Sequence, residues 1–196
     1  MANIIRHISN NDIIYFIIIS FLLSFEYIFL GGYSYITMFD MGDLHIPLNI
    51  AAKNDFYDYG ISYWNKNHLA GTDLISEGYY WSNIVTFSLQ FLIFPPWFAY
   101  AISKVFFYFI SGYFTYKISK EYFNLPVLGC YFAGITFALI ACNNDAEGLT
   151  SKALFPLVIF FLIKITNVEN KIYWFFSIFL LALFYASGSF FVWDYI

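Results

Sequence analysis

Five long apolar stretches run through this 196-residue sequence, and they restrict its fold more than any other feature. Several reach the roughly 20 residues that an α-helix needs to cross the hydrocarbon core of a bilayer. Each is flanked by polar or charged residues, as membrane spans are. Only 11% of the residues are charged while 61% are hydrophobic, which is too little charge to cover a water-facing surface. We therefore expect lipid, and not water, to surround most of this chain.

The apolar stretches predict an all-α fold, a multi-pass transmembrane helical bundle that forms a single domain over residues 1–196. A polar outer loop at 33–83 and a short apolar run at 84–94 interrupt the bundle. Pro95 and Pro96 stop that short run, so we expect it to be an interfacial or re-entrant helix. About five spans are expected, at residues 13–32, 97–118, 126–142, 149–165 and 172–192.

Charge indicates the orientation of the bundle, because the cytoplasmic side of a membrane protein retains Lys and Arg. If the spans alternate, most acidic residues lie on the side opposite the N-terminus, which places the loop at 33–83 outside and the N-terminus inside. The net charge of −4 and the absence of a basic stripe argue against a nucleic-acid partner. Five basic residues share the side of the N-terminus: Arg6, Lys117, Lys120, Lys164 and Lys171.

Asp40 and Asp43 stand three residues apart, soon after the first span. Pro47 suits the first turn of a helix, and apolar residues follow it at helical spacing, so we expect an amphipathic helix on the membrane surface. An acid at this depth could act as a general base, or it could help to bind a divalent cation. The alternative is that both acids only cap the surface helix and keep the loop in water. The apolar face of this helix would comprise Leu48, Ala52, Phe56 and Tyr59.

Further along the same loop, Trp64 and His68 stand among amides and a Gly turn that indicate a structured binding loop. Trp64 could equally belong to the aromatic belt of a membrane protein. His68 and His45 lack the spacing of known metal-binding motifs, so no histidine metal site is predicted.

Lys104 and Glu26 are ionisable residues within predicted spans, where such groups usually face the bundle interior or a wet cavity. They could pair with each other. Lys104 could instead bind the phosphate of a lipid donor, or it could extend its ammonium to the interface. Lys152, at the outer start of the fourth span, presents the same alternatives.

The order of these features resembles the GT-C superfamily of membrane glycosyltransferases, and more narrowly the bacterial YfhO-type membrane proteins. The resemblance rests on Asp40, on Asp43 to Leu48 (DLHIPL), on Tyr63-Trp64-Asn65 and Gly71-Thr72-Asp73, and on the apolar run ending in Phe94-Pro95-Pro96. It implies sugar transfer from a polyprenyl-phosphate donor to a cell-envelope acceptor outside a bacterial cytoplasmic membrane. It further implies a catalytic first-loop acid, Asp43 by position, with Asp40 as the competitor.

Proteins of that superfamily usually have about twice as many spans, so this chain corresponds to their N-terminal portion, with a partner subunit or a C-terminal portion to be supplied. Two alternatives to a transferase are a transporter or flippase subunit and a non-catalytic membrane scaffold. Transporters are expected to have polar residues near the bilayer midplane. The nearly featureless middles of the third and fifth spans count against that alternative.

Overall fold

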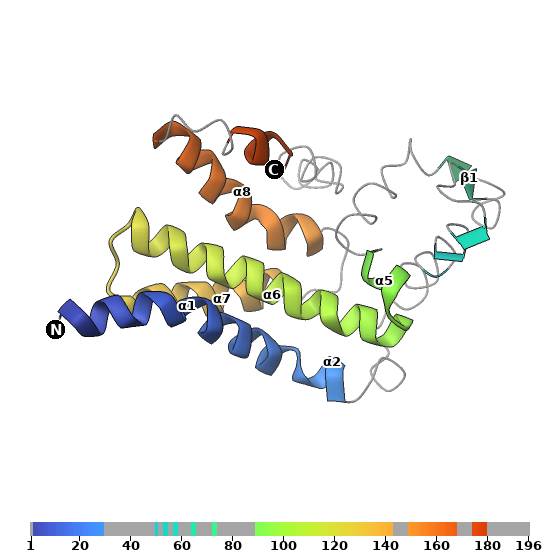
Figure 1. Cartoon of the computed structure of the whole chain (residues 1–196), viewed down its shortest axis with the longest axis horizontal. Helices are drawn as coiled ribbons and strands as arrows, with labels where there is room; N and C mark the ends of the chain where they lie inside the picture. Colours follow the sequence, from blue (N-terminus) through green and yellow to red (C-terminus); the bar gives the residue numbers. More distant parts are fainter. Residues whose placement is uncertain are drawn as a thin grey trace.

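The computed structural model describes residues 2–29, 50, 53–54, 57–58, 64–65, 72–73, 89–142, 149–167 and 174–179. Within these ranges the chain is helical, apart from short connections such as 122–126 and one antiparallel pair of two-residue strands. The predicted all-α class is therefore confirmed. Figure 1 shows the long helices lying side by side.

The first helix, α1, spans Ala2–Leu23, and a short helix, α2, follows it at Phe25–Phe29. Helix α1 therefore begins before the apolar stretch that starts at position 13. At the junction, the Ser24 amide donates to the Ser20 carbonyl over 3.0 Å, and the Ile28 amide donates to the Ser24 carbonyl over 3.2 Å. Both bonds join residues four apart, as in an α-helix, so the helical path continues through a local irregularity at Ser24.

Between α2 and the next long helix, the structure describes only short pieces of the outer loop. The described positions within 50–58 are helical, while the apolar-face residues Leu48, Ala52, Phe56 and Tyr59 lie outside the described residues. Strand β1 (Trp64–Asn65) pairs with β2 (Thr72–Asp73), with Trp64 opposite Asp73.

Helix α5 (Leu89–Ile93) and helix α6 (Pro96–Glu121) are separated by the two prolines of the sequence. Pro95 is the N-cap of α6, and Pro96 occupies its first turn, where a missing amide hydrogen costs nothing. The amides of Phe98 and Ala99 donate to the Pro95 carbonyl over 3.0 and 2.9 Å.

Two more long helices complete the described bundle, α7 (Val127–Cys142) and α8 (Leu149–Asn167), and residues 174–179 form a further helical piece. Helix α6 is central, because α1, α5, α7 and α8 all pack against it. The main apolar core lies between α2, α5, α6, α7 and α8, and its larger buried members are Tyr27, Phe91, Tyr100, Phe107, Tyr108 and Cys142.

A close crossing of α6 and α7 is made possible by two glycines. A Cβ atom on Gly134 would lie 2.6 Å from the Gly112 carbonyl oxygen, a distance that real Cβ atoms essentially never show. Phe16 of α1 packs into the same crossing and is 1% exposed. Small residues at helix interfaces allow this kind of backbone approach.

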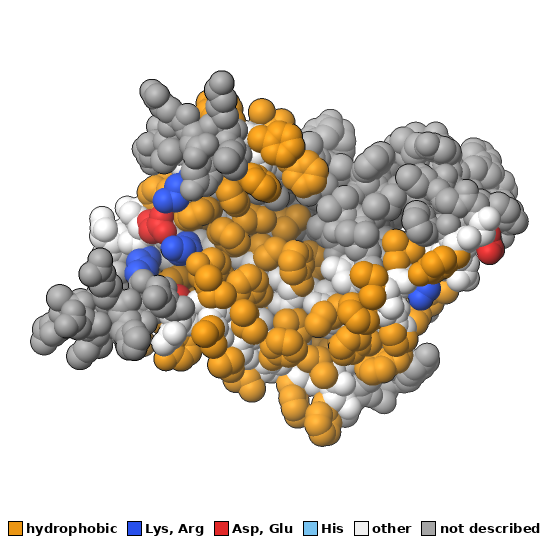
Figure 2. Space-filling view, viewed as in Figure 1, with side chains coloured by type: hydrophobic (Ala, Val, Ile, Leu, Met, Phe, Trp, Pro, Cys, Tyr) orange, Lys and Arg blue, Asp and Glu red, His pale blue; other side chains and the backbone are white. Residues whose placement is uncertain are grey.

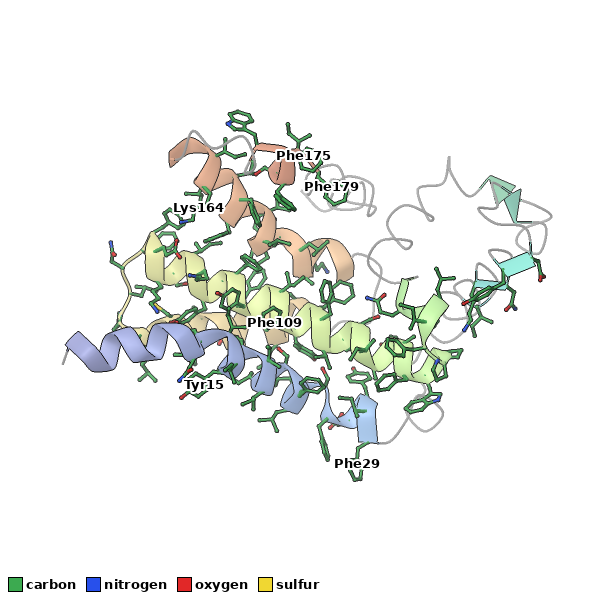
Figure 3. The ribbon with its side chains drawn as sticks, viewed as in Figure 1. Tyr15, Phe29, Phe109, Lys164, Phe175 and Phe179 are labelled. Carbon is green, nitrogen blue, oxygen red and sulfur yellow. The ribbon has the colours of Figure 1, made fainter. Side chains whose placement is uncertain are left out.

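Large apolar side chains cover the outward faces of several helices. On α7, Leu128 and Phe132 are 83% and 73% exposed. In Figure 2 hydrophobic side chains fill most of the visible described surface, and charged side chains gather towards its two ends. Figure 3 shows Tyr15 and Phe29 projecting away from the bundle. Within the described ranges, no helix meets both the length and the apolarity required of a membrane span.

Candidate functional site

The charged side chains whose contacts are described lie at the two ends of the bundle. One end holds the last turns of α6 and α8 and the start of α7, and α1 reaches it near Asp12. The other end holds α2, α5 and the first turns of α6, which bound residues 30–88. The predicted outer loop at 33–83 therefore leaves and rejoins the bundle at this second end, which we name the loop end.

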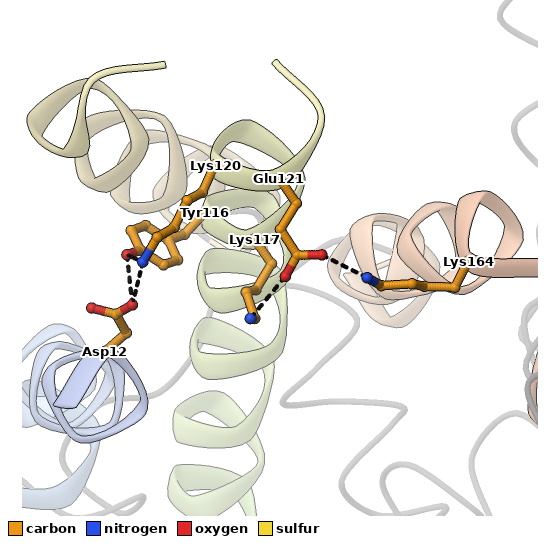
Figure 4. Close-up of polar contacts among 6 residues, drawn as sticks. All are labelled: Asp12, Tyr116, Lys117, Lys120, Glu121 and Lys164. Atoms are coloured by element: carbon orange, nitrogen blue, oxygen red, sulfur yellow. Dashed lines mark hydrogen bonds and ion pairs between the residues drawn. The ribbon is translucent and has the colours of Figure 1, made fainter. Parts of the chain in front are cut away.

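At the end opposite the loop end, Asp12 accepts hydrogen bonds from three side chains, and we name this group the Asp12 cluster. Tyr116 and Lys120 of α6 donate to its Oδ2 over 2.7 and 2.8 Å, and Tyr131 of α7 donates to Oδ1 over 2.9 Å. The Asp12 side chain is 6% exposed. Figure 4 shows the carboxylate reaching from α1 to the side chains of α6. The cluster therefore joins three helices through one buried charge.

Burial opposes the ionisation of Asp12, but the hydrogen bonds from Lys120, Tyr116 and Tyr131 outweigh it, so the pKa of this carboxyl lies below its ordinary value. The carboxylate is thus the stable form in the fold. Three side-chain donors engage both of its oxygens, which makes it a structural anchor and a poor candidate for proton transfer.

A second group, the Glu121 cluster, joins α6 to α8 at the same end. Glu121 forms ion pairs with Lys117 over 2.9 Å and with Lys164 over 2.7 Å. Burial raises the pKa of Glu121, yet the hydrogen bonds from Lys164 and Lys117 bring it below the ordinary value. These side chains are about 30% exposed, so water screens the pairs and each contributes little.

At the loop end, Lys104 is completely buried, and it forms what we name the Lys104 node with Tyr27, Tyr100 and Cys142. Its Nζ donates to the Cys142 carbonyl over 3.1 Å. The same ammonium lies 5.2 Å from the ring centre of Tyr27 and 5.6 Å from that of Tyr100. The ammonium therefore faces the bundle interior, as expected of an ionisable residue within a span, and it does not extend to the interface.

The structure separates the residues that the sequence proposes as a site. Asp40, Asp43 and His68 lie outside the described residues, and Trp64 is described only by its backbone in β1. Lys152 is exposed near the start of α8, whereas Lys104 is buried in α6. No ion pair joins Lys104 to Glu26, which is exposed, so their suggested pairing is wrong.

From the sequence, the lysines of the Asp12 and Glu121 clusters indicate only the orientation of the bundle, and nothing identifies the clusters themselves. Tyr116 and Lys120 are four residues apart on one helix, as are Lys117 and Glu121, and both spacings could have been noticed. Nothing in the sequence pairs Asp12 with Lys120, because 108 residues separate them.

The described part of the chain contains no group of three or more His, Cys, Asp or Glu side chains able to hold a metal ion. Both cysteines, Cys130 and Cys142, are buried free thiols of α7. Comparison of the chain with protein-family models, curated proteins and solved structures finds no match.

Removing the charge of Asp12 tests its anchoring role. Asp12→Asn is expected to cost about 1.5–3 kcal/mol of unfolding free energy, the range for hydrogen bonds to charged groups. The pKa of Asp12 is lowered in the folded state. The stability that Asp12 contributes is therefore fully present above its unfolded-state pKa of about 4, and it is lost as the pH falls through the folded-state pKa. Thermal unfolding of the detergent-purified protein at neutral and acid pH measures both effects.

The matched control for this experiment is Lys117→Gln, which breaks a more exposed ion pair at the same end and should cost less than about 1 kcal/mol. Wild type should lose stability in acid more steeply than Asp12→Asn. Equal acid sensitivity in the two proteins would show that Asp12 does not carry the anchor.

Proposed function

We propose that this chain is a multi-pass protein of a bacterial cytoplasmic membrane that acts as a glycosyltransferase or as the N-terminal portion of one. In this proposal it transfers a sugar from a polyprenyl-phosphate donor to a cell-envelope acceptor. Asp43, or its neighbour Asp40, would take the proton of the acceptor hydroxyl or hold a divalent cation against the donor phosphate. The proposal rests on the residues that resemble the GT-C superfamily.

The membrane part of the proposal is supported by the distribution of exposed side chains. Many outward-facing residues of α1, α7 and 174–179 are large and apolar. Ile18, Leu128 and Ile178 are one example from each. The described ion pairs, by contrast, are confined to one end of the bundle. An apolar belt that ends in charged side chains fits a bilayer, where acyl chains replace water around the middle of each helix.

The single observation that carries the catalytic part is the location of Lys104 at the loop end. Lys104 is a buried cation in the region from which the segment containing Asp40 and Asp43 leaves the bundle. Tyr57 of this segment donates a hydrogen bond to the Leu92 carbonyl of α5 over 2.9 Å, which ties the outer loop to the same end. A rigid bundle end next to the point where an acid-bearing segment leaves suits a reaction at the membrane surface.

A non-catalytic membrane scaffold is the second candidate. Its support is that the Asp12 and Glu121 clusters satisfy their charges internally and join helices, which is the work of a structural element. A scaffold would tolerate substitution of Asp40 and Asp43, whereas a transferase would not.

The experiment that separates the two compares envelope glycans in source cells that carry wild type, Asp43→Asn or Asp40→Asn in place of the native gene. Asp58→Asn is the matched control, because Asp58 is an exposed acid of the same loop. We expect Asp43→Asn to abolish the glycan product at unchanged membrane abundance, because an amide is a poor base and a weak cation ligand. A wild-type glycan profile from both Asp40→Asn and Asp43→Asn would exclude the transferase.

A further inference from the structure

Lys104 is an expensive residue to bury, and its surroundings show how the cost is offset. An ammonium that leaves water must be paired or hydrogen-bonded to be tolerated. The Cys142 carbonyl that accepts from it belongs to the last residue of α7, where helix carbonyls lack intrahelical partners and the helix dipole is negative. The positive charge therefore matches the end of α7 in both hydrogen bonding and electrostatics.

Two aromatic rings also lie close to this ammonium. Tyr27 comes from α2 and Tyr100 from α6, and their rings meet edge to face with centres 5.6 Å apart. Cation–π attraction is strongest where the cation has lost its water, as Lys104 has. Phe91 of α5 is buried in the same apolar core as these tyrosines.

The helices that meet at the Lys104 node are those from which the outer segments leave. Helix α2 ends just before residues 30–88, and α5 begins directly after them. Helix α7 ends just before residues 143–148. The segment 30–88 contains Asp40 and Asp43 of the proposed function, and 143–148 contains Asp145 and Glu147. One buried charge thus lies at the junction of both segments with the bundle.

We infer that Lys104 is a positioning residue for the outer face of the protein. Its ammonium fixes the end of α7 against α2 and α6, and so sets the points from which the two outer segments leave the bundle. Lys104 touches no substrate in this role, which is distinct from the phosphate-binding alternative that the sequence raises. The consequence for catalysis rests on the proposed function, but the fixing of α7 does not.

The two cysteines of the chain provide reporters for this inference. Cys142 belongs to the Lys104 node, and its Sγ lies 3.6 Å from the Ser111 hydroxyl oxygen. Cys130 lies near the other end of α7, where its Sγ contacts the Leu125 carbonyl at 3.3 Å. Both are completely buried, so alkylation of either thiol requires local opening of the bundle around it.

The experiment measures alkylation of the full chain, purified in detergent, with N-ethylmaleimide. Cys130→Ser leaves Cys142 as the reporter of the loop end, and Cys142→Ser leaves Cys130 as the reporter of the opposite end. Lys104→Met keeps an unbranched side chain in the core but removes the charge. We expect it to speed alkylation of Cys142 roughly tenfold or more, the scale of one lost hydrogen bond to a charged group, and that of Cys130 less than about twofold.

Two further variants sharpen the result. Lys104→Arg retains the charge and the donors, so Cys142 should react more slowly than in Lys104→Met. Lys152→Met removes an exposed lysine and should change neither rate. An unchanged Cys142 rate in Lys104→Met, or an equal rise at both cysteines, would overturn the inference, because the first shows no fixing and the second shows general loosening.

Glycan analysis then decides whether this positioning serves the reaction. We expect Lys104→Met to lower the product at wild-type membrane abundance. A wild-type product level from Lys104→Met, in cells where Asp43→Asn has lost the product, would show that the reaction does not depend on Lys104. If Asp43→Asn itself has no effect, the proposed function fails, and the alkylation rates still decide whether Lys104 fixes α7.

Discussion

Replacing Gly134 with alanine is expected to destabilise the protein by about 3 kcal/mol or more, at the upper end of the cost of overpacking a core. The new Cβ would lie 2.6 Å from the Gly112 carbonyl oxygen and 2.9 Å from Cζ of Phe16. An aromatic ring can move by a few tenths of an ångström, but a backbone carbonyl inside α6 cannot move without the helix. The substitution therefore forces α6 and α7 apart along their main contact.

Alanine substitutions at two other glycines of the same pair of helices are expected to cost less and serve as comparisons. A Cβ on Gly112 would meet Phe16 ring atoms at 3.2 Å, a contact that a small shift relieves, so Gly112→Ala should cost about 1 kcal/mol. A Cβ on Gly129 would lie 3.5 Å from Pro126, which is ordinary contact. Since alanine favours the helix by up to about 1 kcal/mol over glycine, Gly129→Ala should be neutral or slightly stabilising.

Unfolding of the purified variants in detergent, followed by circular dichroism, measures this series. The order of stability should be Gly129→Ala, then Gly112→Ala, then Gly134→Ala. If Gly134→Ala proves as stable as Gly129→Ala, the close crossing of α6 and α7 is not part of the native packing.

The helical class of this chain could be predicted from sequence because long apolar runs leave the backbone few ways to satisfy its polar groups. The boundary between α5 and α6 likewise follows from Pro95 and Pro96, since proline suits a first turn and disrupts a helix interior. The start of α1 at Ala2 does not follow, because hydropathy marks position 13, whereas a helix can continue through polar residues that precede an apolar run.

The polar contacts of the bundle were harder to predict, because they depend on how the helices rotate about their axes. The sequence marks Lys104 as an unusual residue within an apolar run, but its acceptor is a backbone carbonyl 38 residues away. A backbone acceptor leaves no mark in a sequence. The role of Asp12 is not predictable from sequence for a related reason, since it stands at the polar edge of its apolar run and its partners lie on α6 and α7.

The candidate catalytic acids remain a prediction from the sequence. Asp40 and Asp43 are candidates because of their place after the first apolar run and because of the resemblance, and both lie outside the described residues. What the structure adds is the arrangement of the loop end, which holds the Lys104 node and the bond from Tyr57 to α5. Substitution of Lys104 therefore tests whether the loop end matters for the proposed reaction, and this test does not depend on where the loop itself lies.

Phe16→Ala is expected to cost about 3–5 kcal/mol, the usual range for removing a buried phenylalanine. The Phe16 ring stacks on Tyr131 with ring centres 5.5 Å apart, and its centre lies 5.3 Å from that of the Tyr116 ring. Loss of the Phe16 ring therefore leaves a cavity where α1 meets α6 and α7. Phe21→Ala is the matched control on the same helix, because Phe21 is 46% exposed and its removal leaves no internal cavity. Equal losses from the two variants would contradict the docking of α1 through Phe16.

The double variants show which atoms obstruct a larger residue at each glycine. Gly112→Ala should cost less in a Phe16→Ala background than in wild type, because its close contacts at 3.2 Å are atoms of the Phe16 ring. Gly134→Ala should remain costly in that background, because the Gly112 carbonyl oxygen is still 2.6 Å from the new Cβ. Full rescue of Gly134→Ala by Phe16→Ala would show that the ring, and not the backbone of α6, limits how closely the two helices approach.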